Sequence, residues 1–193
     1  MGSAKTLTNT ELRRVLDYVA TRKHAARNRA MVLMTFLGGM RVGEVASLRY
    51  ADVFNSDGSV KSEIRLTSEQ TKGMNGRIVF LSDRLKKELA GYIDKVPYRR
   101  VDGAFFYTQK NNNRGFTANT MAQHFLHLYR AVGIEGASSH SGRRTFATSL
   151  SSKGVGVRVL MRAMGHKNIS TTIGYVDASD DMLRGAVNLL KCR

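Results

Sequence analysis

Cysteine, proline and acidic residues are scarce in this chain of 193 residues, which contains one Cys, one Pro and no Trp. Cys192 has no second cysteine to pair with, so an intramolecular disulfide and a cysteine-ligated zinc site are excluded. The longest apolar run covers residues 30–37, whereas a helix that crosses a bilayer needs about 20 residues. We therefore expect no membrane-spanning segment, and the near absence of cysteine fits a reducing compartment.

Acidic residues are outnumbered throughout, with 15 Asp and Glu against 31 Lys and Arg and a formal net charge of +16. The imbalance is strongest between residues 103 and 176, where nine basic residues accompany a single acid, Glu135. In the first 102 residues the two signs alternate, as on an ordinary solvated surface. An excess of this size predicts a polyanionic partner, most often nucleic acid.

Hydrophobic periodicity and turn signals predict a mainly α chain with a small antiparallel β-sheet (α+β). Thr8 and Glu11 have the spacing of a capping box at the start of the first helix, and Ser82 and Thr117 are expected to cap two later helices. Residues 24–37 are apolar enough on most sides to form a buried helix that Gly38-Gly39 ends. Asn75-Gly76 is a dipeptide typical of hairpin turns, and strands are expected on either side of it. Helices are expected over residues 9–22, 24–37, 41–48, 82–95, 117–132, 139–153, 157–164 and 180–191, with a short piece at 169–176, strands at 64–67 and 77–81, and an extended piece at 104–107.

The usual signatures of hydrolases and nucleotide-dependent enzymes are missing, including the nucleophile elbow, the phosphate-binding loop and the His-Glu-x-x-His helix. His124 and His127 lie three residues apart on a predicted helix, a spacing that permits shared metal ligation. No Asp, Glu or Cys lies nearby in the sequence to complete such a site. We therefore favour the interpretation that one of these histidines lies beside the core and the other on the surface, and we expect no metal site.

Cationic side chains and one tyrosine remain as candidates for chemistry. Arg41 follows a helix break at Gly38-Gly39 and leads into Glu44. His140-Ser-Gly-Arg143 places two donor side chains three residues apart on one helical face. A second break at Gly165-His166 is followed nine residues later by Tyr175. Each feature has a structural alternative: the tyrosine as a core residue, the arginine as a helix cap.

Taken in order, these segments resemble the tyrosine recombinase (phage integrase) family closely. The matching segments are Gly39-Met-Arg41-Val-Gly-Glu44, Thr71-Lys72-Gly73, His140-Ser-Gly-Arg143, Met164-Gly-His166 and Tyr175. The resemblance extends from Leu7 to about Leu190. It implies a fold of the tyrosine recombinase catalytic-domain type. We expect residues 1–193 to form a single catalytic domain, with residues 1–7 as a tag or a disordered start. Most family members carry an N-terminal core-binding domain, which is not expected in this sequence, so the chain is either a catalytic fragment or one of the short recombinases.

The resemblance implies a site-specific recombinase or integrase that cuts and rejoins DNA through a 3′-phosphotyrosyl link on Tyr175, without metal, ATP or another cofactor. Arg41 and Arg143 would stabilise the charge on the phosphate, because a guanidinium stays charged and can bond two oxygens at once. Lys72 would protonate the leaving 5′-oxygen, although an exposed hairpin lysine is commonplace. The remaining implied roles are a base or hydrogen-bond donor at His140, a phosphate donor at His166, an orienting carboxylate at Glu44, and DNA contacts at Arg144, Arg162 and Lys167.

Gly142 and Arg144 depart from the family pattern, which usually has Leu and His at these places. Glycine costs about 1 kcal/mol relative to alanine inside a helix, so either the helix begins near Gly142 or the backbone packs closely there. Arg144 adds a donor for the DNA backbone.

The resemblance implies double-stranded DNA as the partner, bound by a homo-tetramer on two DNA sites, and a monomer in the absence of DNA. The C-terminal helix, in residues 180–193, either docks on a neighbouring protomer or packs on its own domain. A cytoplasmic, nucleoid-associated protein of prokaryotic, phage or archaeal origin is expected. Two alternatives remain open: a catalytically silent DNA-binding module of the same fold, and a type IB topoisomerase-like enzyme.

Overall fold

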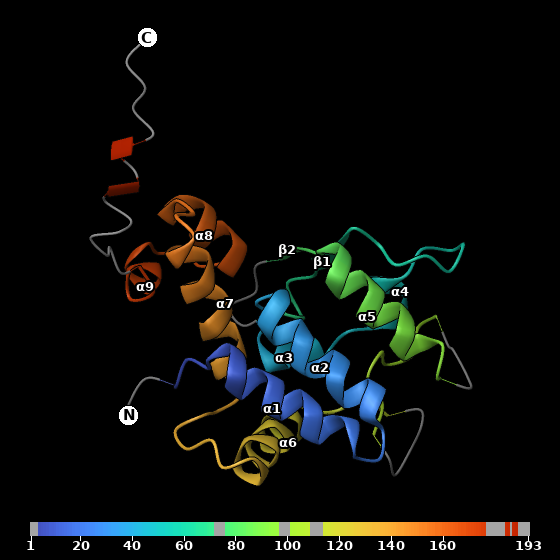
Figure 1. The fold of residues 1–193 in the computed structure, drawn as a ribbon. Coiled ribbons are helices and arrows are strands. Elements are labelled where there is room, and N and C mark those ends of the chain that lie inside the picture. The colour runs from blue at the N-terminus through green and yellow to red at the C-terminus, as the bar shows by residue number, and fades with distance from the viewer. Residues whose placement is uncertain are drawn as a thin grey trace.

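The computed structural model describes residues 4–71, 76–96, 101–108, 114–176, 184–185 and 187–188 (Figure 1). The helices are α1 (Asn9–Ala20), α2 (Ala25–Leu37), α3 (Val42–Ala46), α4 (Tyr50–Val53), α5 (Asp83–Ile93), α6 (Ala118–Ala131), α7 (Ser141–Ser152), α8 (Val157–Met164) and α9 (Ser170–Ile173). The strands are β1 (Glu63–Leu66) and β2 (Arg77–Phe80). The predicted fold class is confirmed, and α4 is a short helix that the sequence pattern did not predict.

Local signals account for several helix ends. The Thr8 hydroxyl accepts a hydrogen bond from the Glu11 N–H at 3.2 Å, and the Glu11 carboxylate accepts one from the Thr8 N–H at 2.9 Å. Ser82 and Thr117 cap α5 and α6 through their side-chain oxygens. Helix α2 ends before Gly38, as predicted. Each cap satisfies backbone groups left unpaired at a helix end, so short-range sequence was enough to predict it.

The two strands pair antiparallel with Ile64 opposite Val79 and Leu66 opposite Arg77. Ile64, Leu66 and Val79 are buried, whereas Phe80 on the other face is 70% exposed. Side chains alternate between the two faces of a strand, so Arg77 lies on the same face as Val79. Residues 72–75 of the segment that joins the strands, Lys72 among them, lie outside the described residues.

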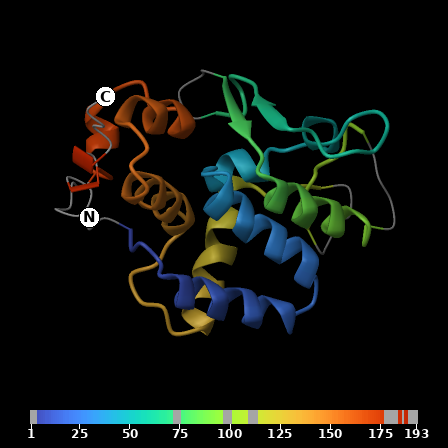
Figure 2. The same cartoon turned by 45° about the horizontal axis from the view of Figure 1, so that its top comes forward.

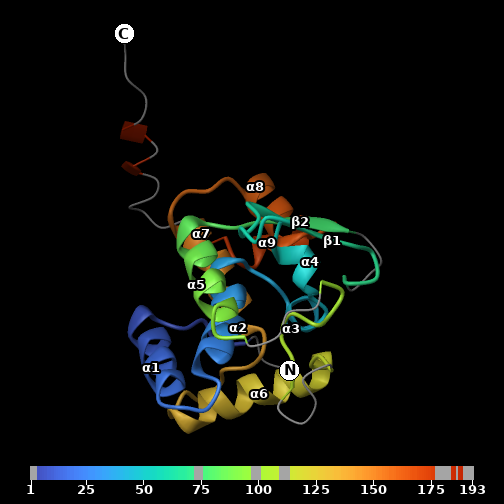
Figure 3. The ribbon, with the colours of Figure 1, turned by 90° about the vertical axis from the view of Figure 1, so that its right-hand side faces the viewer.

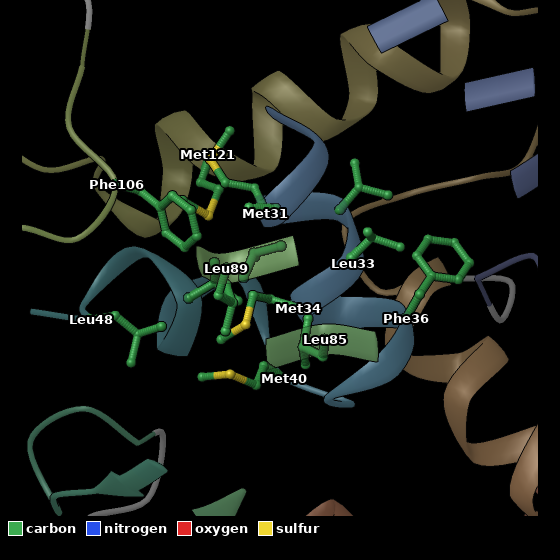
Figure 4. Packing of buried hydrophobic residues seen from close by; sticks show 14 of the residues in the cluster. Met31, Leu33, Met34, Phe36, Met40, Leu48, Leu85, Leu89, Phe106 and Met121 are labelled. Carbon is green, nitrogen blue, oxygen red and sulfur yellow. The ribbon is translucent and has the colours of Figure 1, made fainter. Parts of the chain in front are cut away.

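Helix α2 forms the centre of the hydrophobic core, with Met31, Leu33 and Met34 fully buried. It packs against α1, α5 and α7, and Figure 2 shows it lying between α1 and α5. Figure 4 shows its side chains meeting residues of α5 and α6, such as Leu89 and Met121. The prediction that residues 24–37 form a buried helix is confirmed.

Helices α7, α8 and α9 gather at one end of the molecule (Figure 1), away from α1 and α6 in the side view (Figure 3). Ala147, Leu160 and Met164 form a second, smaller hydrophobic cluster there, and Tyr175 packs partly against it. Helix α7 links this cluster to the main core, because it packs against α2.

Gly142 lies in this contact between α7 and α2. A Cβ at this position would lie 2.1 Å from Oγ1 and 2.8 Å from Cβ of Thr35 in α2. Helix α7 also begins one residue earlier, at Ser141. Both explanations offered for this glycine therefore hold: it lies in the first turn, and it lets the backbone of α7 approach α2 closely.

Two expectations need correction. Residues 4–7 are not a disordered start, because Leu7 is 4% exposed and its N–H donates to Thr145 Oγ1 at 2.9 Å. Helix α7 begins at Ser141 rather than 139, so His140 lies at its N-cap instead of within the helix. The extended piece expected at 104–107 pairs through isolated antiparallel bridges, Ala104 with Arg49 and Tyr107 with Gly115.

The predicted helix at 180–191 lies mostly outside the described ranges, so its docking is not described. In the part of the chain that is described, no helix is both long and apolar enough to cross a membrane.

Candidate active site

One pocket, of about 420 Å³, collects most of the predicted site residues. It lies where the start of α3, the start of α7, the turn after α8 and the turn after α9 come together. Its lining residues are Ala4, Arg41, Gly136, Ser138, His140, Arg143, Arg144, His166 and Tyr175. Lining residues as far apart in the sequence as Ala4 and Tyr175 thus meet in one cavity.

Gly39 forms one wall of the site through its backbone. Its φ is +60°, and an added Cβ would lie 2.4 Å from Cδ1 of Phe146. Only glycine fits, because the left-handed conformation and the ring of Phe146 both leave no room for a side chain. The Gly39 carbonyl accepts hydrogen bonds from Arg143 Nη1 at 2.5 Å and from Arg77 Nη2 at 3.4 Å. The break after α2 therefore supplies an acceptor that holds two guanidinium groups.

Glu44 holds Arg41 at the start of α3. The Arg41 N–H donates to Glu44 Oε2 at 2.8 Å, and Arg41 Nη1 donates to Glu44 Oε1 at 2.8 Å. Glu44 is 1% exposed, whereas the Arg41 side chain keeps 26% of its surface at the pocket. Burial would raise the pKa of the Glu44 carboxyl, but the hydrogen bonds and charge of Arg77 and the N–H of Arg41 hold this pKa below its ordinary value. Glu44 is thus ionised at neutral pH.

Arg143, in the first turn of α7, is 4% exposed. Besides the bond to Gly39, its Nη2 donates to the carbonyl of Met164 and lies 3.2 Å from His166 Nε2. Burial, with the charges of Arg41 and Arg77, lowers the pKa of Arg143 to about 9. The guanidinium therefore remains charged at pH 7 but is poorly compensated, which favours binding of an anion.

His166 is placed by the end of α8. Gly165 caps that helix with φ +60°, a conformation that glycine adopts readily. A guanidinium can only donate, so His166 Nε2 accepts from Arg143, and the ring proton lies on Nδ1, 2.9 Å from Thr172 Oγ1. Burial and the charges of Arg143, Arg41 and Arg77 lower the pKa of His166 to about 4. The imidazole is therefore neutral at pH 7.

Tyr175 follows α9 and is half-buried at the pocket. Its ring lies 6.1 Å from the His166 ring, between centroids, at an interplanar angle of 23°. Arg144 lies on the ring, with Cζ 5.4 Å from the centroid, and donates from Nε to Thr6 Oγ1 at 3.2 Å. The Tyr175 ring thus lies near both a neutral imidazole and a guanidinium, and the cation–π contact with Arg144 restricts the ring.

His140 lies at the mouth of the pocket as the exposed N-cap of α7. Its backbone N–H donates to Ser138 Oγ at 3.3 Å. The N-terminus of a helix carries a partial positive charge, so α7 adds to the positive potential around His140 and Arg143. This end of the pocket is suited to an anion.

Four predicted site residues do not line this pocket, and one of them is Glu44, which is buried against Arg41 and Arg77. Arg162 and Lys167 are exposed and line a separate groove of about 660 Å³ between β2 and α8. Lys72 lies outside the described residues. In the described part of the chain, no group of three His, Cys, Asp or Glu side chains is placed to hold a metal ion.

Arg77 is a functional candidate that the sequence analysis missed. Its Nη2 and Nε donate to Glu44 at 2.7 and 3.2 Å, and its side chain is 7% exposed. The signal was present in the strand period, which places Arg77 on the buried face with Val79. An arginine at such a position requires a buried partner, and that partner is Glu44.

Solved structures share this fold. The crystal structure of XerA recombinase matches with a TM-score of 0.74 and 25% sequence identity, over 100% of this chain and 65% of that one. The Tn1549 transposon integrase, in complex with a circular intermediate DNA, matches with a TM-score of 0.73 and 19% identity, over 98% of this chain and 67% of that one. The fold is that of a tyrosine recombinase catalytic domain.

Sequence comparison gives the family. The model of the phage integrase family matches residues 5–182, and the chain belongs to that family. The tyrosine recombinase XerA of Pyrococcus furiosus is 27% identical over 194 residues, covering 97% of this chain and 63% of the relative. The chain thus spans about three fifths of the length of the curated relatives it matches.

Proposed function

We propose that this chain is a site-specific DNA recombinase or integrase that cuts and rejoins DNA through a 3′-phosphotyrosyl intermediate on Tyr175. The observation that carries this proposal is the shared pocket of Tyr175, Arg41 and Arg143, in which a tyrosine faces two guanidinium groups. Its family membership supports the same reaction. In this proposal residues 1–193 form a single catalytic domain.

In the proposed reaction the Tyr175 oxygen attacks a phosphorus atom of the DNA backbone. The new bond joins tyrosine to the 3′-phosphate, and the bond from phosphorus to the 5′-oxygen breaks. Lys72 protonates the departing 5′-oxygen, and His140 accepts the tyrosine proton or bonds the phosphate. One phosphoester replaces another, so the link can be reversed by a 5′-hydroxyl without ATP or a metal ion.

Arg41 and Arg143 stabilise the negative charge that accumulates on the non-bridging oxygens. Donors already oriented toward such oxygens can lower a barrier by several kcal/mol. Arg143 is oriented before substrate arrives, because the carbonyls of Gly39 and Met164 hold it. These two guanidiniums take the place that a metal ion occupies in many nucleases.

His166 must change state to serve as a phosphate donor. In the structure its Nε2 accepts a hydrogen bond from Arg143 and carries no proton. A bound phosphate draws the Arg143 guanidinium and adds negative charge, which raises the pKa of the imidazole. His166 Nε2 then takes up a proton from solvent and donates a hydrogen bond to a non-bridging oxygen.

Double-stranded DNA is the proposed partner, and Arg144, Arg162 and Lys167 are proposed backbone contacts. The net charge of +16 and the DNA complex of the Tn1549 integrase support this assignment. Phosphate contacts make binding salt-dependent. DNA affinity should fall steeply between low and moderate salt, which filter binding or fluorescence anisotropy would measure. An affinity that is insensitive to salt would contradict this partner.

We also propose assembly as a homo-tetramer on two DNA sites, with residues 180–193 docking on a neighbouring protomer. Truncation after Ser179 tests this arrangement. Loss of DNA-dependent assembly in a folded monomer supports exchange between protomers, whereas unfolding supports packing of the segment on its own domain.

The test of the reaction is trapping of the covalent intermediate. Nicked duplexes from a randomised site library are incubated with the protein without metal, and products are separated on a denaturing gel. A covalent protein–DNA band that is absent with Tyr175→Phe is the expected result. Relaxation of supercoils at many sequences without a second site would indicate a topoisomerase instead. No band with any duplex would leave a silent DNA-binding module and refute the proposal.

A further inference from the structure

Arg77, the first residue of β2, joins three parts of the site. Its Nη2 and Nε bond the two oxygens of Glu44, its Nη1 donates to the Ala163 carbonyl at 2.9 Å, and its Nη2 also lies 3.4 Å from the Gly39 carbonyl. The partners belong to α3, to the end of α8 and to the break after α2. One planar guanidinium therefore ties together elements that are distant in the sequence.

The contacts of Arg77 run parallel to those of Arg143. Arg143 donates to Met164 and Arg77 to Ala163, so the two guanidiniums hold consecutive carbonyls at the end of α8. Both also donate to the carbonyl of Gly39. The carbonyls of Ala163 and Met164 have no partner within α8. The two arginines therefore fix the position from which the chain turns toward His166.

Arg77 does not itself face the pocket that holds Tyr175. It is not among the lining residues of that pocket and instead lies on the side of the groove between β2 and α8. The close packing is mutual, because a Cβ on Gly165 would lie 2.4 Å from Cδ of Arg77. Arg77 can therefore influence the pocket only through the residues that it contacts.

We propose that Arg77 is a positioning residue for the reaction: through Glu44 and the end of α8 it sets the places of Arg41, Arg143 and His166 around the phosphate. The inference rests on the proposed function, since it concerns how that same site is held. The Glu44 carboxylate accepts hydrogen bonds from both Arg41 and Arg77. Movement of Arg77 therefore moves Arg41 with it.

Lysine cannot replace Arg77 in this role. The two-oxygen grip on Glu44 and the bond to Ala163 use three nitrogens in a fixed plane, whereas an ammonium is a single point charge. The Arg77→Lys variant keeps the net charge but loses some of the hydrogen bonds to Glu44 and Ala163. Misplacement by about 1 Å costs about 100-fold in rate, so a loss of this order is expected in the single-turnover rate of covalent complex formation.

Arg29→Lys provides the matched control. Arg29 Nε and Nη2 bond the two oxygens of Glu88 at 2.7 and 2.6 Å, which is the same two-oxygen grip between α2 and α5. Neither residue lines the pocket. This variant should cleave at the rate of the unaltered chain, and DNA affinity should be unchanged in both variants.

Three substrates separate positioning from a merely structural role. They share the nicked duplex that gives most covalent product and differ at the scissile group: an ordinary phosphate, a methylphosphonate without negative charge, and a phosphate with a 5′-sulfur leaving group. Each comparison is made within one protein preparation, so the fraction of folded protein cancels. Arg77→Gln provides a second variant if Arg77→Lys does not fold.

The rate loss in Arg77→Lys should shrink on the methylphosphonate, because a neutral phosphorus centre gains less from guanidinium groups. It should persist with the sulfur leaving group, which departs without a general acid. Three results would overturn the positioning role. They are a wild-type rate in Arg77→Lys, an equal rate loss on all three substrates, and a rate loss that disappears only with the 5′-sulfur substrate. The last result would locate the effect at Lys72. Absence of covalent product from the unaltered chain would instead refute the proposed function, and the positioning role with it.

Discussion

Replacement of Gly142 by alanine tests the contact on which the site is built. In a free helix the substitution would stabilise by about 1 kcal/mol. Here the new Cβ would lie 2.1 Å from Oγ1 and 2.8 Å from Cβ of Thr35, distances that real Cβ atoms do not show. Thr35 is fully buried in α2, and its Cβ cannot move away without moving the helix. Overpacking of a core costs about 1–3 kcal/mol, and this site lies at the upper end.

The net expectation for Gly142→Ala is a loss of about 2 kcal/mol in the free energy of unfolding. For a chain of this size, 1 kcal/mol shifts the unfolding temperature by about 2–4 °C, so the midpoint should fall by about 4–8 °C. Because Arg143 follows directly, the rate of covalent complex formation should fall as well. Thermal unfolding followed by circular dichroism measures the first effect.

Gly91→Ala is the matched control for this prediction. Gly91 lies in α5, and a Cβ there would meet nothing within 4 Å. Alanine should stabilise the protein by up to about 1 kcal/mol at this position. If Gly142→Ala were as stable as the unaltered chain, or shifted upward like Gly91→Ala, the close approach of α7 to α2 would be refuted.

Three further outcomes are expected. Gly39→Ala, which introduces both a left-handed alanine and a contact of 2.4 Å with Phe146, should lower the unfolding temperature and abolish cleavage; retained cleavage would show that the Gly39 carbonyl does not hold Arg143. The pKa of His166 is lowered to about 4 in the folded protein, so the unfolded chain binds the proton more readily and the free energy of unfolding should fall as pH drops from 6.5 toward 4. His166→Gln should flatten this pH dependence in a series of unfolding curves. An unchanged slope would argue against a neutral His166. Arg27 is 4% exposed and donates to the amide oxygen of Asn28 and to the Tyr107 carbonyl. Asn28→Ala removes that side-chain acceptor from a buried charge and should lower the free energy of unfolding by about 2 kcal/mol, which an unchanged urea midpoint would contradict.

The charge of the site explains why it should bind an anion before it does chemistry. Arg41, Arg77 and Arg143 surround one carboxylate, Glu44, so cations outnumber the acid there. Their mutual repulsion contributes to the lowered pKa of Arg143. An anion relieves this repulsion, and a ligand that binds only the folded state stabilises it. A short nicked duplex should therefore raise the unfolding temperature.

Short-range sequence was sufficient for much of the architecture. The caps at Thr8, Ser82 and Thr117, the stop at Gly38 and the buried face of α2 were all predicted, because each depends on neighbouring residues or on a helical period. The order of Arg41, His140, Arg143, His166 and Tyr175 also identified the family, since the motifs can be matched without knowing where they lie in space.

Contacts between distant segments were decided only by the tertiary structure. Arg77 and Arg143 are held by the carbonyls of Gly39, Ala163 and Met164, and every residue has a carbonyl, so no residue type marks these acceptors in the sequence. The neutral state of His166 likewise comes from burial beside cations that lie far away along the chain. Sequence pattern therefore determined which residues could do chemistry, and packing determined their protonation and their partners.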